Sequence, residues 1–280
     1  MRTEDDFAQA YLENDFDRAL RTEPETMVLR MIELLELNDP NDAIREMNSA
    51  IQDGKMPLIV VNHQSLADGP ALTAITSQLD AGFNLPVAAS IDIGLQGKYI
   101  QSVNSRLDPI LAQRNLFTVP IITGGDVEKR EMVKGTTGLP KLVKTAQSGR
   151  GFAMFPEASV QGGRHNDGGG INGLVRPTHP SAFTGWVERF ANQGADPVVL
   201  PVGIDGSYKI FDPVSNSFPS SILRMLIGYE KLRKVGTITL GKLIPFDEVK
   251  SAGGSDDFFM EKIAALLPEA SRGVYPIPSK

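Results

Sequence analysis

His63 and Asp68 flank the end of a short apolar segment, in a stretch that reads LIVVNHQSLAD from Leu58 onward. Residues 58–61 are apolar and partly β-branched, which predicts a buried strand, and the alanine-rich segment after Asp68 predicts a helix. Open α/β sheets bind ligands at such strand ends. A neutral histidine can take a proton from a hydroxyl, and a carboxylate on its other ring nitrogen would fix the tautomer. The same spacing is equally compatible with a helix-capping aspartate beside an ordinary surface histidine.

A second group of candidate residues follows another apolar segment, Phe152–Phe155. The group consists of Glu157, Ser159, Gly162, Gly163 and Arg164. Glu157 is the first charged side chain beyond the predicted strand, and the small residues would let backbone amides approach an anion closely. The arginine adds a fixed positive charge. A glycine-rich loop after a strand is also an ordinary connection, so this pattern alone does not establish a site.

Arg114 stands just before a third apolar segment, residues 116–122. A guanidinium group can hold a phosphate through two parallel hydrogen bonds. The alternative is a solvated surface arginine, which is the commoner environment for this side chain.

Composition limits the classes of protein to consider. The chain has 280 residues, of which 41% are hydrophobic and 22% charged, as in ordinary globular proteins. It has no cysteine, which excludes disulfides, thiolate zinc sites and a cysteine nucleophile. A net charge of −6 argues against nucleic acid as a partner. No apolar run approaches the ~20 residues that span a bilayer.

Metal and localisation follow from the same features. His63, His165 and His179 lack the spacing of metal ligands, so we expect no metal site. We expect a cytoplasmic protein, or one of the plastid stroma if the source is a plant. It would be soluble or bound to a membrane only peripherally.

Two regions are expected along the chain. Residues 1–54 carry apolar residues at helical spacing and the capping pair Asp39–Pro40, which predicts a small N-terminal helical region. Residues 55–280 alternate between apolar runs and helix-like segments, which predicts an α/β domain with a mostly parallel sheet flanked by helices. Strands are expected at 58–61, 85–89, 116–122, 152–155, 198–204 and 237–244, and helices at 70–79, 93–103, 139–147, 181–192, 220–233 and 255–267. Pro201 lacks a backbone donor, so its strand is expected at a sheet edge or a bulge.

Taken together, the motifs resemble those of the glycerolipid acyltransferases. That family has an NHxxxxD block, an arginine-bearing block, an FPEG block and a proline-containing apolar block, in this order. The matching segments are NHQSLAD at 62–68, Arg114, FPEAS at 155–159 and VVLPVGI at 198–204. With RNL at 114–116 and GGR at 162–164, the chain looks most like the soluble plastid-type glycerol-3-phosphate acyltransferases, which also carry an N-terminal helical domain. Ala158 stands in place of the glycine of FPEG, and Asn166 stands where a second arginine is expected. These departures leave the identity of the acceptor substrate open.

The resemblance implies transfer of a fatty acyl group from a thioester to the hydroxyl of glycerol 3-phosphate, the first step of glycerophospholipid synthesis. His63 would be the general base and Asp68 its partner. Arg114 and Arg164 would hold the acceptor phosphate. Glu157 would bind an acceptor hydroxyl or position an arginine, and backbone amides between Ser159 and Gly163 would stabilise the oxyanion.

The resemblance implies no cofactor beyond acyl-CoA or acyl-carrier protein as the co-substrate. Two alternatives remain, a lysophosphatidate acyltransferase and a non-catalytic lipid-binding module of the same fold. An anionic donor needs a local basic face on an acidic protein. The candidate clusters are Arg224, Lys231, Arg233 and Lys234, and Lys129, Arg130, Lys134, Lys141 and Lys144; solvated helix faces explain both equally well. Apolar residues between 223 and 227 would suit a membrane surface or the core.

Overall fold

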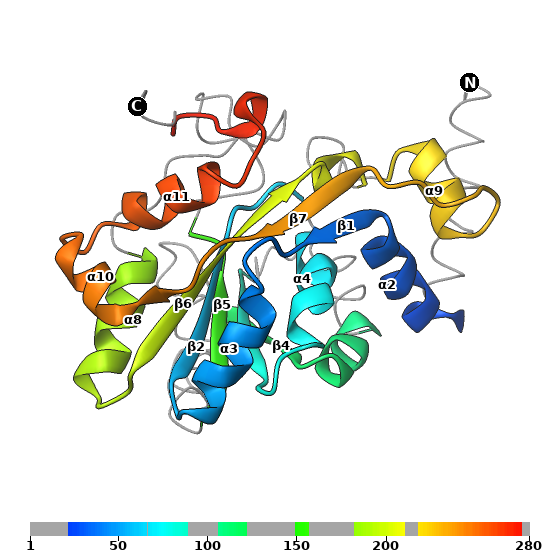
Figure 1. The fold of residues 1–280 in the computed structure, drawn as a ribbon. Helices are drawn as coiled ribbons and strands as arrows, with labels where there is room; N and C mark the ends of the chain where they lie inside the picture. Colours follow the sequence, from blue (N-terminus) through cyan, green and yellow to red (C-terminus); the bar gives the residue numbers. More distant parts are fainter. Residues whose placement is uncertain are drawn as a thin grey trace, which may run out of the picture.

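The described part of the chain forms a mixed sheet with helices on both faces (Figure 1). The structure is a computed structural model, and it describes residues 22–65, 67–88, 106–121, 149–156, 182–210 and 218–275. Its sheet has eight strands in the order β1-β7-β6-β2-β5-β3-β4, with β8 paired to β6. Most neighbours are parallel, while β7 and β8 run antiparallel to β6. The predicted α/β class with a mostly parallel sheet is confirmed.

The elements have the following bounds. The strands are β1 (Leu35–Asn38), β2 (Met56–Val61), β3 (Phe83–Ala88), β4 (Leu116–Ile121), β5 (Gly151–Met154), β6 (Pro197–Asp205), β7 (Gly236–Leu240) and β8 (Ile244–Pro245). The helices are α2 (Pro24–Glu33), α3 (Ala43–Gln52), α4 (Asp68–Thr76), α8 (Ala182–Asn192), α9 (Ser220–Leu226), α10 (Phe246–Ser251) and α11 (Asp256–Ala264), with short 3₁₀ turns η1 (Ser207–Lys209) and η2 (Glu269–Ser271). Residues 106–113 are also helical.

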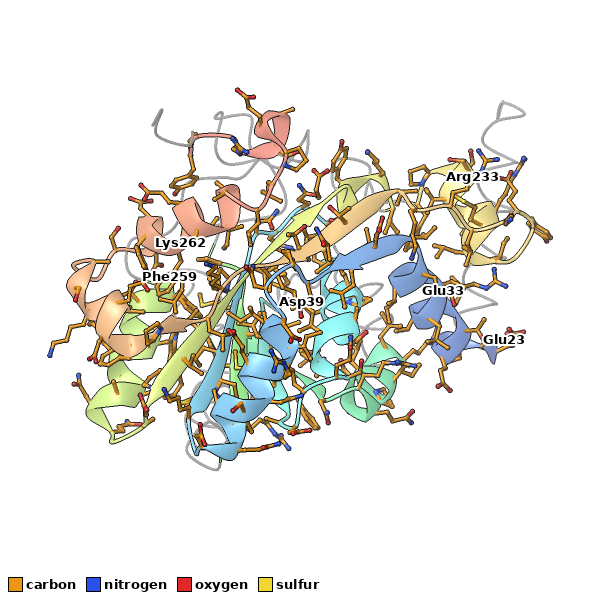
Figure 2. All side chains as sticks on the ribbon, viewed as in Figure 1. Glu23, Glu33, Asp39, Arg233, Phe259 and Lys262 are labelled. Carbon is orange, nitrogen blue, oxygen red and sulfur yellow. The ribbon has the colours of Figure 1, made fainter. Side chains whose placement is uncertain are left out.

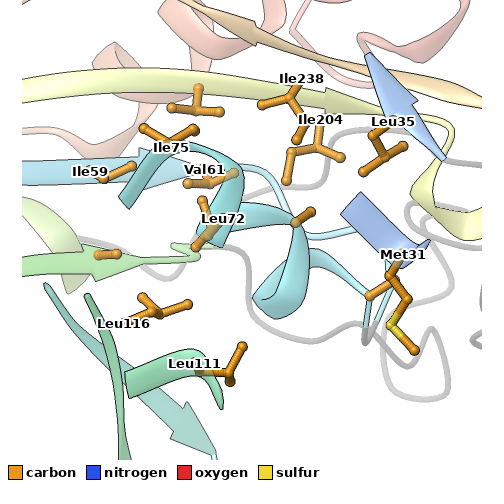
Figure 3. Close-up of a cluster of buried hydrophobic side chains, with 14 of the residues drawn as sticks. Met31, Leu35, Ile59, Val61, Leu72, Ile75, Leu111, Leu116, Ile204 and Ile238 are labelled. Carbon is orange, nitrogen blue, oxygen red and sulfur yellow. The ribbon is translucent and has the colours of Figure 1, made fainter. Parts of the chain in front are cut away.

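β2 divides the interior into two cores. Ile59 and Val61 belong to the cluster under α2, α4 and the helical residues 106–113 (Figure 3). Leu58 and Val60 belong to the cluster under α8 and α11 on the other face. Because both faces are covered, every residue of β2 is buried, which is why its sequence is continuously apolar and not alternating.

The sequence predicted a helical N-terminal region, but part of this region forms a strand. α2 and α3 are present, but residues 35–38 between them form β1, which pairs in parallel with β7. Leu34 and Leu35 continue the helical spacing of Met31, so the local pattern predicts a longer α2. Pairing to β7 replaces the helical hydrogen bonds, and Leu34 O accepts from Val235 N at 2.8 Å. Tertiary pairing therefore overrides local helical spacing here.

Pro201 lies in a central strand that pairs with β2 in unbroken register, so the prediction of an edge strand is wrong, and the interruption lies in the neighbouring chain and not as a bulge of its own strand. β6 pairs with β2 on one side and with β7 and β8 on the other. The expected single strand at 237–244 is split by residues 241–243, and Pro201 O accepts from Gly241 N at 2.9 Å on this side. In a β-strand the N–H and C=O groups of one residue point to the same neighbouring strand. The side on which Pro201 lacks an N–H therefore faces the interruption at residues 241–243. A Cβ on Gly241 would lie 2.7 Å from Pro201 Cγ, so only glycine fits beside the ring.

Several predicted helices differ in extent. α9 ends at Leu226 because Gly228 adopts φ +90°, so the helix predicted to residue 233 is half as long. α3 begins at Ala43, where Asp39 accepts from Ala43 N and Ile44 N, and ends before Gly54 as predicted. The predicted helices at 93–103 and 139–147 lie outside the described residues. None of the helices in the described ranges is long and apolar enough to cross a bilayer.

Candidate active site

His63 and Asp68 meet at the carboxyl end of β2, the central parallel strand. His63 Nδ1 lies 2.8 Å from Asp68 Oδ2. The same oxygen accepts from the backbone N–H groups of Gln64 at 2.6 Å and Ser65 at 2.8 Å. Asp68 is fully buried at the first turn of α4, while the side chain of His63 keeps 19% of its surface exposed. The imidazole is thus held from inside and reaches solvent on one side.

The hydrogen bonds to Asp68 assign its chemical role. Three donors converge on Oδ2, so this oxygen acts as an acceptor and carries no proton. Nδ1 of His63 is then the ring nitrogen that donates to this oxygen. The helix dipole at the start of α4 also favours a negative charge at Asp68. Asp68 Oδ1 is buried and has no hydrogen-bond partner in the part of the chain described.

Asn62 fastens the turn that carries His63 to the end of β6. Its side chain behaves like a strand residue: Nδ2 donates to Ile204 O at 2.8 Å, and Ile204 N donates to Oδ1 at 2.7 Å. The side chain thereby continues the β2–β6 pairing one step beyond Val61. The backbone itself is left to turn away from the sheet and direct its next N–H groups at Asp68.

Gln64 and Ser65 add a second attachment to the same neighbouring turn. Gln64 is buried, and its Oε1 accepts from Gly206 N at 3.0 Å. Ser65 Oγ donates to Ser207 O at 3.1 Å. These contacts join residues 142 apart in sequence, so the position of His63 depends on β6 as much as on β2. The sequence analysis missed these roles; the one available signal was the run of polar residues directly after an apolar strand.

Phe155 covers one face of the imidazole. The two rings stack with centroids 4.2 Å apart and planes 20° apart. Phe155 follows β5, the parallel neighbour of β2, so both rings lie at carboxyl ends of adjacent strands. Phe155 was predicted as a strand residue and not as part of a site. Glu157 follows it by two residues in the sequence, and is the first residue of a range outside the described part of the chain.

Arg114 is not brought together with the His63–Asp68 pair. It precedes β4, whose start lies at the amino edge of the parallel sheet, whereas His63 follows the carboxyl end of β2. Arg114 O accepts from Thr76 Oγ1 at the far end of α4, and its guanidinium lies 3.9 Å from Glu25. A strand of six residues, about 20 Å, separates the two ends of the sheet. We therefore leave Arg114 out of the acceptor site and assign it to packing of α4 against α2.

The remaining predicted site residues lie outside the described residues. They are Glu157, Ser159, Gly162, Gly163 and Arg164. The same holds for the basic cluster between residues 129 and 144. Within the described ranges, no group of three or more His, Asp or Glu side chains is arranged to hold a metal ion.

A groove of about 620 Å³ lies elsewhere, along α3 and the segment after α4. Its lining includes Asn48, Gln78 and Asp80, which are already joined: Asn48 donates to Gln78 O and accepts from Asp80 N. The segment after α4 leads back to the start of β3, so this groove is at the amino edge of the parallel strands, away from His63.

Comparison with known proteins adds no assignment. The chain matches no protein-family model, and a search of curated proteins finds no significantly similar sequence. Functional inference therefore depends on the motif residues and on the geometry around His63.

Proposed function

We propose that this protein is an O-acyltransferase that moves a fatty acyl group from a thioester to the hydroxyl of a glycerol phosphate acceptor. The observation that carries the proposal is the contact of His63 Nδ1 with Asp68 Oδ2 at 2.8 Å, with the carboxylate buried and the imidazole partly exposed. An aspartate serving only as a helix cap would not need a histidine among its donors. The motif order in the sequence supplies the acyl-transfer chemistry to which this pair is suited.

The proposed reaction needs only one general base. His63 Nε2 takes the proton of the acceptor hydroxyl as its oxygen attacks the thioester carbonyl carbon. The tetrahedral intermediate then expels the thiolate, which receives the proton back from the imidazolium, so that an ester and a free thiol result. Asp68 fixes the tautomer and stabilises the imidazolium between the two proton transfers. General-base assistance of this kind contributes about 10²–10⁴ in rate.

The acceptor proposal rests on fewer residues than the sequence suggested. With Arg114 at the other edge of the sheet, Arg164 is the remaining arginine of the resemblance for the acceptor phosphate, with Glu157 for a hydroxyl. Phe155 favours this arrangement, because its stacking on His63 brings the chain to within two residues of Glu157 at the same strand ends. Glycerol 3-phosphate is our first proposal for the acceptor and a lysophosphatidate the second.

Turnover with defined substrates tests the proposal. Purified protein would be incubated with radiolabelled acyl-CoA or acyl-carrier protein, and with glycerol 3-phosphate, a lysophosphatidate or no acceptor. Labelled lysophosphatidate formed from glycerol 3-phosphate supports the first acceptor, and labelled phosphatidate formed only from the lysolipid supports the second. Thioester binding without product from either acceptor would indicate a non-catalytic lipid-binding module and overturn the proposal.

A further inference from the structure

A basic corner lies where α9 leads into β7. We define it as Lys209, Arg224, Lys231, Arg233 and Lys234, all of which are exposed. Residues 218–236 carry four cationic side chains and one acidic one, a net charge of +3 in a chain of net charge −6. Arg224, Lys231 and Arg233 form no ion pair with any described residue. Within the described ranges their charge is therefore not neutralised by an ion pair.

The basic corner is joined to the carboxyl edge of the sheet, on which His63 lies. Lys209 follows β6 directly, and its Nζ lies 3.4 Å from Val235 O just before β7. Gly206, which donates to Gln64 beside His63, adopts φ +86°, and a Cβ there would lie 2.5 Å from Val235 O. β7 is the second strand from β2, about 10 Å away at ~4.8 Å per strand. A surface that binds the basic corner would consequently lie beside the candidate active site.

Two exposed apolar side chains border the basic corner. Tyr229 is 59% exposed and Leu29 of α2 is 37% exposed, and the two segments are tied by Arg30, whose Nη1 donates to Met225 O at 2.9 Å. The apolar residues between 223 and 227 that the sequence suggested for this role are instead buried or packed against the core. Tyr229 is thus the exposed apolar side chain beside the cations, whereas Leu29 has Glu25 and Glu33 one helical turn before and after it on α2.

Neighbouring acidic residues restrict the direction of approach. Figure 2 shows Arg233 near α9 at one end of the molecule, with Glu33 and Glu23 along α2 below it at the same end. An anionic surface is attracted from the α9 side and repelled from the α2 side, so it would bind in one orientation.

We propose that the basic corner docks the protein on an anionic lipid bilayer, with Tyr229 entering the headgroup region. Cationic side chains beside an exposed aromatic match the composition of interfacial membrane-binding surfaces. The attraction is electrostatic, acts within about 10 Å at moderate salt, and requires no pocket. This inference is separate from the acyl-transfer proposal, because docking is measured without turnover.

Vesicle sedimentation with a charge-matched control tests the docking. Full-length protein would be mixed with vesicles of phosphatidylcholine alone or of phosphatidylcholine and phosphatidylglycerol in equal amounts. The test variant is Lys231→Glu/Arg233→Glu. The control is Lys242→Glu/Lys250→Glu, which changes the net charge equally at exposed positions beyond the far end of β7 and on α10. Circular dichroism melting checks that both variants are folded.

We expect the wild type to bind only the mixed vesicles and to be released by salt. The test variant should partition at least about tenfold more weakly, and the control within about twofold of wild type. Tyr229→Ser should weaken binding several-fold without changing its salt dependence. No binding of the wild type, or equal loss in both double variants, would overturn the proposal. The proposal would also be overturned if the test variant bound vesicles as the wild type does but had a raised KM for acyl-CoA or acyl-carrier protein. That result would assign the basic corner to binding of the acyl donor.

Discussion

Two buried aspartates, each the first residue of a helix, are used in different ways. Asp256 begins α11 and divides its bonds between both oxygens: Oδ2 accepts from Phe183 N, and Oδ1 accepts from Thr184 N and Oγ1 at the start of α8. Asp68 begins α4 and gathers three donors on Oδ2 alone, one of them an imidazole. Both side chains are about equally buried.

The difference separates a structural carboxylate from one suited to the proposed chemistry. Both oxygens of Asp256 accept hydrogen bonds, all from groups that do not titrate near neutrality, so its contribution is to hold α8 and α11 together. Asp68 keeps a buried oxygen without a partner among the described residues, which costs stability, while orienting a histidine that reaches solvent. Such a cost is typical of residues selected for function over stability.

Replacing His63 should have the largest effect. His63→Ala removes the proposed general base, and we expect kcat for the proposed acyl transfer to fall about a hundredfold to ten-thousandfold. Stability should fall by about 1–3 kcal/mol, since both the stack on Phe155 and a hydrogen bond to the buried Asp68 are lost. Steady-state kinetics and urea unfolding measure the two quantities. A folded variant that keeps more than about a tenth of the activity would contradict the assignment, because the expected factor exceeds it.

The pair Asp68→Asn and Asp256→Asn should separate activity from stability. At residue 68 an asparagine can place its carbonyl at the Oδ2 position and its NH₂ at the unpartnered Oδ1 position, so the turn survives, but the imidazolium loses its counter-charge. We expect kcat to fall about a hundredfold or more, with unfolding weakened by about 1 kcal/mol.

At residue 256 the asparagine NH₂ must face a buried N–H donor of Phe183 or Thr184. We expect the free energy of unfolding to fall by about 1–3 kcal/mol more than in Asp68→Asn, with kcat within about twofold of wild type. Denaturant unfolding and steady-state kinetics on both variants test this contrast. The expectation is wrong if both substitutions mainly lower stability, or if both mainly lower kcat.

Asn62→Leu probes the attachment of the catalytic turn to β6. Leucine has a similar size but leaves Ile204 N and O without partners in the interior, at about 1–3 kcal/mol for each group. We expect lower stability and a several-fold lower kcat, because the turn carrying His63 loses its fixed position. Asn84→Leu is the control, since buried Asn84 makes a side-chain bond to Gly151 O in another part of the sheet. It should lower stability without a specific effect on kcat.

Phe155→Leu should have the smallest effect. It removes ring stacking worth about 0.5–1.5 kcal/mol but keeps the site apolar. We expect a two- to fivefold change in kcat, as His63 is still held by Asp68 at about the strength of a charge-assisted hydrogen bond. NMR of the His63 ring protons should shift clearly, because the ring current of Phe155 is lost. An unshifted spectrum would mean that the rings do not stack in solution.

Local pattern was sufficient for much of the fold and for the central pair. The apolar run at 58–61 predicted β2, the alternation of segments predicted the layered sheet, and His63 and Asp68 are close in sequence across one turn. The local pattern gave wrong predictions where the structure of a segment depended on residues far away in the sequence. Residues 35–38 became a strand because β7 was available, and Pro201 entered a central strand because the neighbouring chain is interrupted at residues 241–243.

By itself, then, the sequence determined the class of fold and a histidine–aspartate pair at a strand end, because strand periodicity and a five-residue turn are local properties. Only the tertiary structure decided that Arg114 lies at the opposite edge of the sheet, that Asn62 and Gln64 hold the turn to β6, and that Lys209 of η1 lies against the approach to β7. The physical reason is that strand order and register bring together groups more than a hundred residues apart, and no local spacing encodes that order.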